Sequence, residues 1–370
     1  MNSPRTFLIL FCLGVALART LLAEPVSNVP PEAVQKIDAA VEAWKAQSGA
    51  PALSVAVVLD NQLAFTKGYG LADVEKKIPG SDETVYRIAS LTKSLTAIAV
   101  MQLVEQGKLD LEAPIQKYCP IFPEKQWPVT PRQLLIHFAG IRHNTWGETR
   151  STQHYASTNE AVTVFKDDAL LFEPGTKYSY STQGYVLLGC AIEGASGVPY
   201  FQYLTDHVLK PAGMTKTTLD DASLNVPNRA VGYRKGLFGF SWLAWLRGVH
   251  EVPPHDTSIK VPAGGLLSTV GDMANFAIAV MSGRLVQPDT LEKMWTKPKT
   301  RDGKESDYGF GFVIGEKNGQ RRVYNDGSQA GTRTFLFLMP EKKYALCLMT
   351  NLERADCETM NQTIREAVLK

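Results

Sequence analysis

The sequence predicts an α+β protein: an antiparallel β-sheet flanked by helices, with an inserted all-helical domain. Short runs of β-branched and apolar residues, typical of strands, occur near both ends of the chain. The middle, from about residue 109 to 209, is typical of helices separated by turn-rich loops. With 370 residues, the chain exceeds what one simple core normally needs, so we expect one large domain or two closely packed domains.

The first predicted elements are an amphipathic helix and a strand pair. Residues 32–47 have the apolar spacing of a helix, and they are followed by Leu53–Leu59 and Leu63–Tyr69. These two runs flank Asp60-Asn61, which is typical of a tight turn between antiparallel strands. An apolar helix is then predicted to follow Ser90 and to end at Gly107.

Strand signals return late in the chain. Three short runs, separated by turns, precede a last helix over about residues 354–369: Arg321–Tyr324, Thr332–Met339 and Tyr344–Thr350. We therefore assign residues 32–110 and 260–370 to an α/β sheet domain and residues 111–259 to a mainly helical domain.

The N-terminus has the pattern of an export signal. Arg5 precedes an apolar run of about a dozen residues, and small residues up to Ala23 offer cleavage sites. We expect residues 1–23 to be a signal peptide, residues 24–31 a linker, and the protein to be exported, either periplasmic or secreted. The alternatives are a membrane anchor or an organellar transit peptide, although the run is shorter than the roughly 20 residues that span a bilayer.

Charge and cysteine content narrow the function classes. Removal of residues 1–23 leaves 37 basic and 37 acidic residues, so electrostatics give no case for nucleic-acid binding. The spacings of the four remaining cysteines match no zinc pattern, and three of them lie in apolar surroundings and are most simply buried apolar groups. A disulfide stays open, without an assigned pairing. The cysteines are Cys119, Cys190, Cys347 and Cys357.

Ser90 and Lys93 form the first candidate catalytic element. Residues three apart share one face of a helix, and Ser90 lies where free N–H groups and the positive dipole end favour a developing anion. A buried lysine loses its proton more easily and is then able to deprotonate a serine. The spacing therefore predicts an acyl-transfer site.

The second element is the aromatic segment 178–185. Tyr180 is a candidate proton relay if a nearby cation lowers its pKa, whereas packing between loop and helix accounts for Tyr178 and Tyr185. His137 and His143 are better explained as structural hydrogen-bonding groups than as bases.

The third element is the segment 325–332, which lies between two strand signals. Gly327 would let an acyl substrate approach the strand closely, because no Cβ intervenes. The backbone N–H groups of Ser328 and Ser90 would then form an oxyanion hole. The alternative interpretation is a glycine-rich hairpin turn.

Other chemistry finds little support in the sequence. No Gly-x-Ser-x-Gly elbow or glycine-rich phosphate loop occurs, and Pro253-Pro254 interrupts the spacing of His250, Glu251 and His255 as metal ligands. Residues 236–247 are unusually apolar, which is typical of a flap, a membrane-surface contact or a packed hydrophobic loop.

The order Ser90-x-x-Lys93, Tyr180 and a glycine-containing strand resembles the serine β-lactamase and penicillin-binding-protein superfamily. The resemblance covers about residues 33–369 and looks closest to the class C-like (peptidase S12 type) branch, particularly the mitochondrial serine β-lactamase-like proteins. Further stretches carry it: 83–90, 107–111, 132–143, 172–182 and 264–272.

The resemblance implies an active site between the sheet domain and the helical domain. Ser90 would be the acylated nucleophile, Lys93 its activating partner and Tyr180 the general acid/base. Ser90 and Ser328 would supply the oxyanion N–H groups, and Gly327 and Thr182 would line the substrate site. The resemblance implies no metal and no organic cofactor.

Two positions depart from the family pattern. Thr182 stands where many relatives have asparagine, although the mitochondrial branch resembles this chain there. Asn325 stands where relatives usually carry lysine or histidine, and asparagine brings no positive charge. Depression of the Tyr180 pKa would then rest on Lys93.

These features predict a serine hydrolase that cleaves small esters, amides or peptides through an acyl-enzyme. The rival within enzymes is a D-alanyl-D-alanine carboxypeptidase or β-lactamase. The rival outside enzymes is a catalytically silent scaffold or binding relative, against which the retention of Ser90, Lys93 and Tyr180 argues. The expected partner is a small-molecule or peptide substrate; the oligomeric state stays open.

Overall fold

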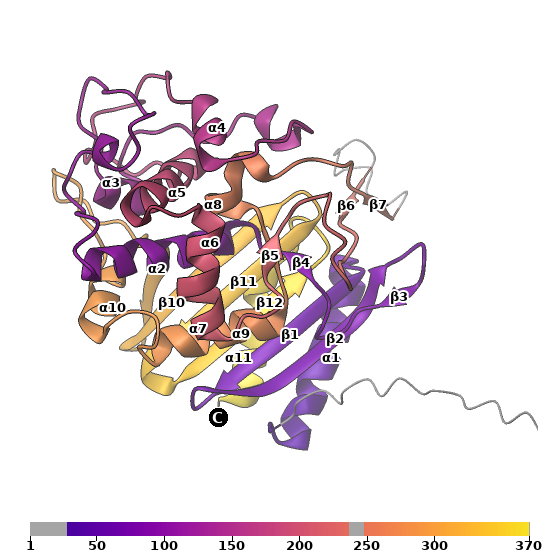
Figure 1. Cartoon of the computed structure of the whole chain (residues 1–370). Helices are drawn as coiled ribbons and strands as arrows, with labels where there is room; N and C mark the ends of the chain where they lie inside the picture. Colours follow the sequence, from indigo (N-terminus) through magenta and orange to yellow (C-terminus); the bar gives the residue numbers. More distant parts are fainter. Residues whose placement is uncertain (1–27, 237–247, 370) are drawn as a thin grey trace, which may run out of the picture.

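A seven-stranded antiparallel sheet forms the centre of the computed structural model, which describes residues 28–236 and 248–369 (Figure 1). Its central pair joins the two ends of the chain, because Leu53 on β1 lies opposite Thr350 on β12. The predicted α+β class is confirmed. The strands lie side by side in this order: β3 (Ile78–Pro79), β2 (Gln62–Asp73), β1 (Ala52–Leu59), β12 (Tyr344–Thr350), β11 (Thr332–Met339), β10 (Gln320–Gln329) and β9 (Val313–Lys317).

The five predicted strands are all present. The turn between β1 and β2 has φ of 51° at Asp60 and 58° at Asn61, as a two-residue hairpin turn with the twist of a sheet requires. The strand predicted over 321–324 is longer than expected, because β10 continues to Gln329 and pairs with β11 along that length. The segment 325–329 is therefore strand, and only Ala330 and Gly331 form the turn.

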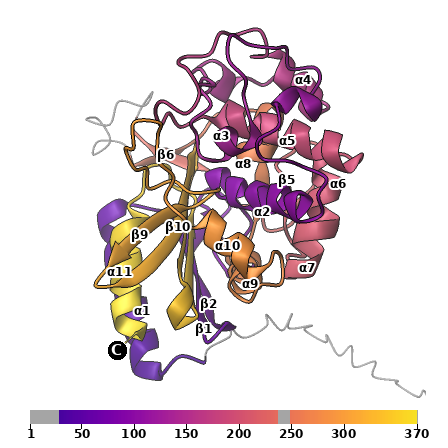
Figure 2. The same cartoon turned by 90° about the vertical axis from the view of Figure 1, so that its left-hand side faces the viewer.

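Helices cover both faces of the sheet. Helix α1 (Pro31–Ser48) and helix α11 (Cys357–Val368) pack together on one face, and Trp44 Nε1 donates a hydrogen bond of 2.6 Å to the carbonyl of Asp356. Figure 2 shows these two helices on one side of the strands, with α9 (Val270–Met281) and α10 (Pro288–Met294) on the other. The predicted first and last helices are thus confirmed.

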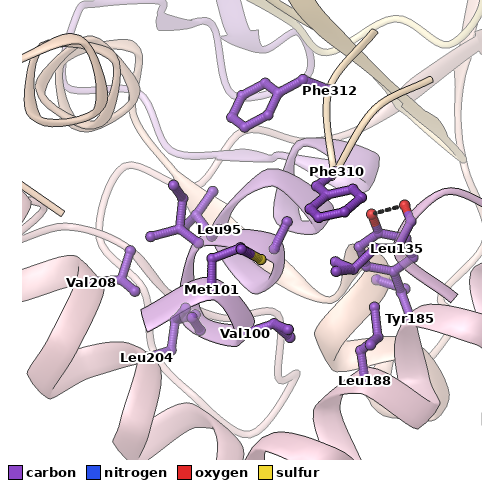
Figure 3. Close-up of a cluster of buried hydrophobic side chains, with 14 of the residues drawn as sticks. Leu95, Val100, Met101, Leu135, Tyr185, Leu188, Leu204, Val208, Phe310 and Phe312 are labelled. Atoms are coloured by element: carbon purple, nitrogen blue, oxygen red, sulfur yellow. Dashed lines mark hydrogen bonds between the residues drawn. The ribbon is translucent and has the colours of Figure 1, made fainter. Parts of the chain in front are cut away.

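Helix α2 (Thr92–Glu105) lies in the core between the sheet and the helices inserted in the middle of the chain. Leu95, Val100 and Met101 are all but inaccessible to solvent, and Figure 3 shows them surrounded by side chains from several other segments. A helix that is apolar on all sides is a buried one. The amine of Lys93 therefore enters the core together with its helix.

Two small sheets and the remaining helical segments lie before, within and after the inserted region. Strand β8 (Leu266–Ser268) lies between β4 (Tyr86–Arg87) and β5 (Thr218–Leu219), and β6 (Tyr233–Lys235) pairs with β7 (Val249–Glu251). The further helical segments are η1 (Ala89–Leu91), η2 (Ile115–Lys117), α3 (Pro131–Leu135), η3 (Glu148–Arg150), α4 (Thr158–Thr163), α5 (Thr182–Ser196), α6 (Tyr200–Leu204), η4 (Thr205–Leu209), α7 (Lys210–Ala212), η7 (Ser258–Lys260), α8 (Val261–Gly264) and η8 (Pro340–Lys342).

A disulfide joins Cys119 to Cys190 and so ties α5 to the segment that follows η2. The structure thereby supplies the pairing that the sequence leaves open. Both residues are buried, and their proximity depends on a fold that the spacing does not reveal. The interpretation as buried apolar groups is confirmed for Cys347 and Cys357, which are free and buried.

One hydrophobic cluster crosses the predicted domain limits, since it includes Ala56 from the sheet and Leu188 from α5. The assignment of residues 32–110, 111–259 and 260–370 to two domains stays a prediction. Of the described helices, none is long and apolar enough to cross a membrane. The predicted signal peptide, the first half of the linker and residues 237–247 lie outside the described residues.

Candidate active site

Ser90 lies in the short helical turn η1, directly before α2 begins at Thr92. The preceding Ala89 has φ of 47°, a left-handed conformation that is uncommon for a residue with a Cβ and that clusters at functional sites. Two hydroxyl groups of β11 hold the chain just before this turn: Thr332 donates to the carbonyl of Arg87 and Thr334 to that of Ile88, each at 3.0 Å. The sheet thus fixes the position of Ser90.

Lys93 lies one turn further along, with its side chain fully buried. Its Nζ is 3.2 Å from Ser90 Oγ and donates a hydrogen bond of 2.7 Å to the carbonyl of Ala263. Burial lowers the pKa of Lys93 well below its usual range, and the positive charge of Lys260 lowers this pKa further, while Asp326 acts in the opposite direction. A neutral amine that is within hydrogen-bond distance of a hydroxyl is able to take its proton.

Tyr180 approaches Ser90 from the other side, where its hydroxyl donates to Ser90 Oγ at 2.8 Å. Desolvation raises the pKa of Tyr180 above its usual range, and the hydrogen bond with Ser90 opposes this shift only in part. The expectation that Lys93 lowers the pKa of Tyr180 is therefore wrong. Burial removes the charge of the lysine on which that expectation depended, so Tyr180 stays a protonated phenol.

Two histidines hold the backbone around Tyr180. The Nδ1 atom of His137 accepts a hydrogen bond of 3.1 Å from the N–H of Ser181, and that of His143 accepts one of 3.2 Å from the N–H of Thr182. The ring of His137 also lies 4.4 Å from that of Tyr180, measured between centroids. The prediction that both histidines are structural hydrogen-bonding groups is confirmed.

The neighbouring tyrosines have different environments. Tyr185 is buried and donates a hydrogen bond of 2.8 Å to the carbonyl of Leu135, as packing at the loop–helix junction predicts (Figure 3). Tyr178 packs edge-on against the ring of His137, as predicted, with 5.9 Å between centroids, but it is also 43% exposed and borders the cavity in front of Ser90. The adjacent buried Tyr308 also borders the cavity, 6.1 Å from Tyr180 between ring centroids.

A cavity of about 520 Å³ opens in front of Ser90. We call its two sides the helical wall, formed by η1, the start of α5 and the η7–α8 segment, and the strand wall, formed by β10 and the turn after it. Residues that line these two sides are Ser90, Tyr180, Thr182, Lys260, Ala263 and Gly264 on the helical wall, and Asn325, Asp326, Ser328, Gln329 and Ala330 on the strand wall.

Asn325 has a largely architectural set of contacts. It is 3% exposed, and its Nδ2 donates to Ser94 Oγ at 2.9 Å and to the carbonyls of Ser90 and Gly311, each at 3.2 Å. Its Oδ1 accepts a hydrogen bond of 2.9 Å from the N–H of Asp326. Asn325 borders the cavity, but the prediction that it binds substrate needs correction, since its polar atoms are engaged in joining β10 to η1 and α2.

Gly327 also has a role other than the predicted one. A Cβ at this position would lie 2.3 Å from Thr334 Oγ1 and 2.5 Å from the carbonyl oxygen of Ile88. The absence of a side chain therefore lets the turn that carries Ser90 pack against β10. Close approach of a substrate to Gly327 is not the reason for the glycine, because these protein atoms fill the space.

The remaining predicted residues lie where a substrate has access to them. Ser328 is exposed on the strand wall, and Thr182 begins α5 at the border of the cavity. Asp326, next to them on β10, forms an ion pair of 2.7 Å with Arg333. The structure thus brings the N-terminal, middle and C-terminal sequence elements together around one cavity.

Sequence analysis missed two groups at this cavity. Lys260 is buried and borders it, although its position between Ile259 and Val261 in an apolar run was a signal for a buried lysine. Asn144 borders it as well, with both side-chain polar atoms buried and unpaired among the described residues. Within residues 28–236 and 248–369, no three histidine, cysteine or acidic side chains are grouped to hold a metal ion.

A serine within hydrogen-bond distance of a lysine and a tyrosine, beside an antiparallel sheet, defines a class of serine hydrolases that includes β-lactamases and penicillin-binding proteins. The family model described as Beta-lactamase matches residues 37–369, and the chain belongs to this family. The resemblance stated from the sequence is confirmed.

Individual relatives agree with this membership. The human mitochondrial serine beta-lactamase-like protein LACTB is 29% identical over 419 residues, which cover 86% of this chain and 74% of that protein. A D-amino acid amidase from Ochrobactrum anthropi SV3, solved in complex with L-phenylalanine amide, is 26% identical, with a TM-score of 0.76 over 91% of this chain and 98% of the amidase. An octameric penicillin-binding protein homologue from Pyrococcus abyssi is 28% identical, with a TM-score of 0.74 over 87% of this chain and 74% of the homologue.

Proposed function

We propose that this protein is a serine hydrolase that cleaves small esters, amides or peptides through an acyl-enzyme on Ser90. One observation carries the proposal: Ser90 Oγ is within hydrogen-bond distance of both a buried lysine, Lys93, and a tyrosine, Tyr180. A nucleophile between a base and a proton donor is the minimal arrangement for acyl transfer.

In the acylation step, Ser90 Oγ attacks the substrate carbonyl and its proton passes to Lys93 Nζ, which burial keeps neutral beforehand. The negative charge that forms on the carbonyl oxygen is stabilised by the N–H groups of Ser90 and Ser328. The bond to the leaving group then breaks, and Tyr180 donates its proton to the leaving oxygen or nitrogen. Tyr180 recovers a proton from the ammonium group of Lys93, which restores both residues.

In the deacylation step, a water molecule attacks the ester carbonyl on Ser90. Lys93 and Tyr180 take the proton of this water and return a proton to Ser90 Oγ as the carboxylic acid leaves. Each half of the reaction therefore begins and ends with a neutral lysine and a protonated tyrosine.

The rivals predict different chemistry at the same place. A β-lactamase or D-alanyl-D-alanine carboxypeptidase would need a group that attracts the substrate carboxylate to the strand wall. This chain instead has Asn325, whose polar atoms are engaged in internal hydrogen bonds, and the carboxylate of Asp326. A silent scaffold would have no need of the contacts that Ser90 makes.

A fluorophosphonate probe tests the proposal, because it phosphonylates an activated serine. We expect labelling of the full chain at Ser90, located by peptide mass spectrometry, together with hydrolysis of 4-nitrophenyl butyrate. Both should disappear in Ser90→Ala. Both should persist in Ser223→Ala, which removes the same hydroxyl from an exposed turn. Wild-type protein that is neither labelled nor hydrolytic would favour the scaffold.

We also propose that the protein is exported. The N-terminal pattern and the Cys119–Cys190 disulfide support this, because disulfides persist mainly in oxidising compartments. N-terminal sequencing of the protein from its native source should find a start near residue 24, and thiol titration should find two free cysteines. An intact leader or four reduced thiols would favour the anchored or organellar alternatives.

A further inference from the structure

Lys260 is a buried lysine on the helical wall that the proposed mechanism does not use. It ends η7, directly before α8, and lies three residues before Ala263, whose carbonyl accepts the hydrogen bond from Lys93. Only 8% of Lys260 is exposed, and the part that remains accessible borders the Ser90 cavity. Burial and the charge of Arg87 lower the pKa of Lys260 to about 8, so its ammonium group stays largely protonated at neutral pH.

The surrounding charges do not neutralise this ammonium group. The nearby carboxylate is Asp220, but Arg87 contacts it at 2.7 Å and Arg229 contacts its other oxygen. One buried carboxylate, Asp220, thus lies near three cations: Arg87 and Arg229, which contact it, and Lys260, which does not. Among the described residues, no hydrogen bond or ion pair involves the Nζ atom of Lys260. A buried cation without a directly bonded anion is costly unless a ligand supplies one.

His255, which lies beside Arg87, contributes no negative charge. A hydrogen-bond distance of 3.1 Å separates Arg87 Nη1 from His255 Nε2, and since a guanidinium group only donates, His255 must accept. Its Nε2 is therefore unprotonated. Burial and Arg87 also lower the pKa of His255 to about 4, so the ring is neutral at physiological pH.

The strand wall carries a carboxylate that is already paired. Its carboxylate, Asp326, borders the same cavity, and the position where relatives usually carry a cation is occupied by the neutral Asn325. The carboxylate of Asp326 is paired with Arg333 at 2.7 Å, and Arg150 and Arg354 also border the cavity. An anionic group that enters this cavity is therefore attracted by its cations, and among these Lys260 is the buried one.

We propose that Lys260 forms an anion-binding subsite on the helical wall and that the hydrolase acts on esters, amides or peptides that carry a carboxylate beside the scissile bond. The ammonium group donates hydrogen bonds to this carboxylate, and its binding reduces the excess positive charge of Lys260 and the Arg87–Asp220–Arg229 cluster. This inference deepens the proposed function and depends on it for the turnover assay below.

Matched esters test the subsite in the full-length protein. For a charge on the acyl side, mono-4-nitrophenyl succinate is compared with 4-nitrophenyl pentanoate. For a charge on the leaving side, 3-acetoxybenzoate is compared with its neutral methyl ester. The readout is the ratio of kcat/KM for the anionic ester to that for its neutral partner, because this ratio cancels a general loss of activity.

We expect Lys260→Met to lower the ratio by about 10- to 100-fold in one of the two pairs, which is the size of a hydrogen bond between charged groups. Lys260→Arg should retain most of the preference. Lys108→Met removes the same charge from an exposed position just after the C-terminal end of α2, far along the chain from Ser90, and should leave the preference unchanged. The affected pair identifies the side of the substrate that carries the anion. Ratios that are the same in wild type and Lys260→Met for both pairs would overturn the proposal.

A binding measurement keeps this test separate from the proposed reaction. In Ser90→Ala protein, saturation-transfer NMR should give tighter binding of the anionic ester than of its neutral partner, and added Lys260→Met should abolish the difference. If the wild type hydrolyses no ester, the proposed function is wrong. The binding comparison still shows whether Lys260 forms an anion-binding subsite. If Lys260→Met does not fold, the loss of preference at high salt and in Lys260→Gln provides the same decision. Equal binding of the two esters would contradict the subsite.

Discussion

The buried polar groups of the helical wall contact Ser90 or face the cavity, whereas those of the strand wall form hydrogen bonds within the protein. On the helical wall, Lys93 and Tyr180 direct their polar atoms at Ser90, and Lys260 borders the cavity without a hydrogen-bonded partner among the described residues. On the strand wall, Asn325 uses its amide to join β10 to the turn of Ser90, and Gly327 accommodates that turn.

This difference assigns chemistry to one wall and positioning mainly to the other. Substitutions on the helical wall should therefore change rate constants and pH dependence with little loss of fold. Substitutions on the strand wall should first cost stability.

Lys93→Met should lower kcat/KM for 4-nitrophenyl butyrate by about 10⁴-fold, because Ser90 loses the group that takes its proton. Lys93→Arg is the matched control for charge: a guanidinium group does not act as a base in proteins, so it should not restore activity. Steady-state kinetics measure the effect. A rate within tenfold of wild type in either variant would remove Lys93 from the mechanism.

Tyr180→Phe should lower kcat/KM by about 10²-fold for a 4-nitrophenyl ester and by up to about 10⁴-fold for an alkyl amide of the same acid. Nitrophenolate leaves without a proton, whereas an amine does not, so the loss should follow the need for a proton donor. The raised pKa of Tyr180 keeps this donor protonated. Equal losses on both substrates would indicate that Tyr180 only positions Ser90.

Asn325→Ala should lower the free energy of unfolding by about 1–3 kcal/mol, since Ser94 Oγ and two buried carbonyl groups lose a donor. Urea titration measures this change. The matched control is Asn275→Ala, which removes a single partly exposed hydrogen bond of 3.3 Å and should cost about 0.5 kcal/mol or less. A variant Asn325→Ala as stable as wild type would refute the architectural role.

The pH dependence of kcat/KM for a neutral ester should show that Lys260 and Asp326 shift the pKa of Lys93 in opposite directions. Activity rises with pH as Lys93 loses its proton, and the lowered pKa of Lys93 places this rise below the usual range of lysine. Lys260→Met should move the rise to higher pH, because the charge of Lys260 lowers this pKa. Asp326→Asn should move it to lower pH, because the charge of Asp326 raises it. Shifts in the same direction would contradict the assignment.

Much of this architecture was predictable because it depends on local pattern. β11 and β12 have the predicted bounds, since continuous apolar or β-branched runs with flanking turns define both ends of each strand. The spacing of Ser90 and Lys93 on a helical turn also follows from local geometry, although the α-helical part begins only at Thr92. Features within one element were therefore accessible to sequence analysis.

Features that depend on contacts between distant segments were not predictable. The raised pKa of Tyr180 reflects burial against other aromatic rings, and the roles of Asn325 and Gly327 depend on how closely η1 approaches β10. The excess positive charge at Lys260 arises only because the fold brings Arg87 and Asp220 close to this residue. Spacing along the chain contains no information about these distances.

The most direct test of the account is to detect the acyl-enzyme itself. Wild-type protein is mixed with 4-nitrophenyl butyrate, quenched in acid within the first turnovers, digested and analysed by tandem mass spectrometry. The account predicts a butyryl ester on Ser90, with 4-nitrophenol released in a stoichiometric burst if deacylation is the slower step. Turnover that continues in Ser90→Ala, or an adduct on a residue other than Ser90, would contradict it.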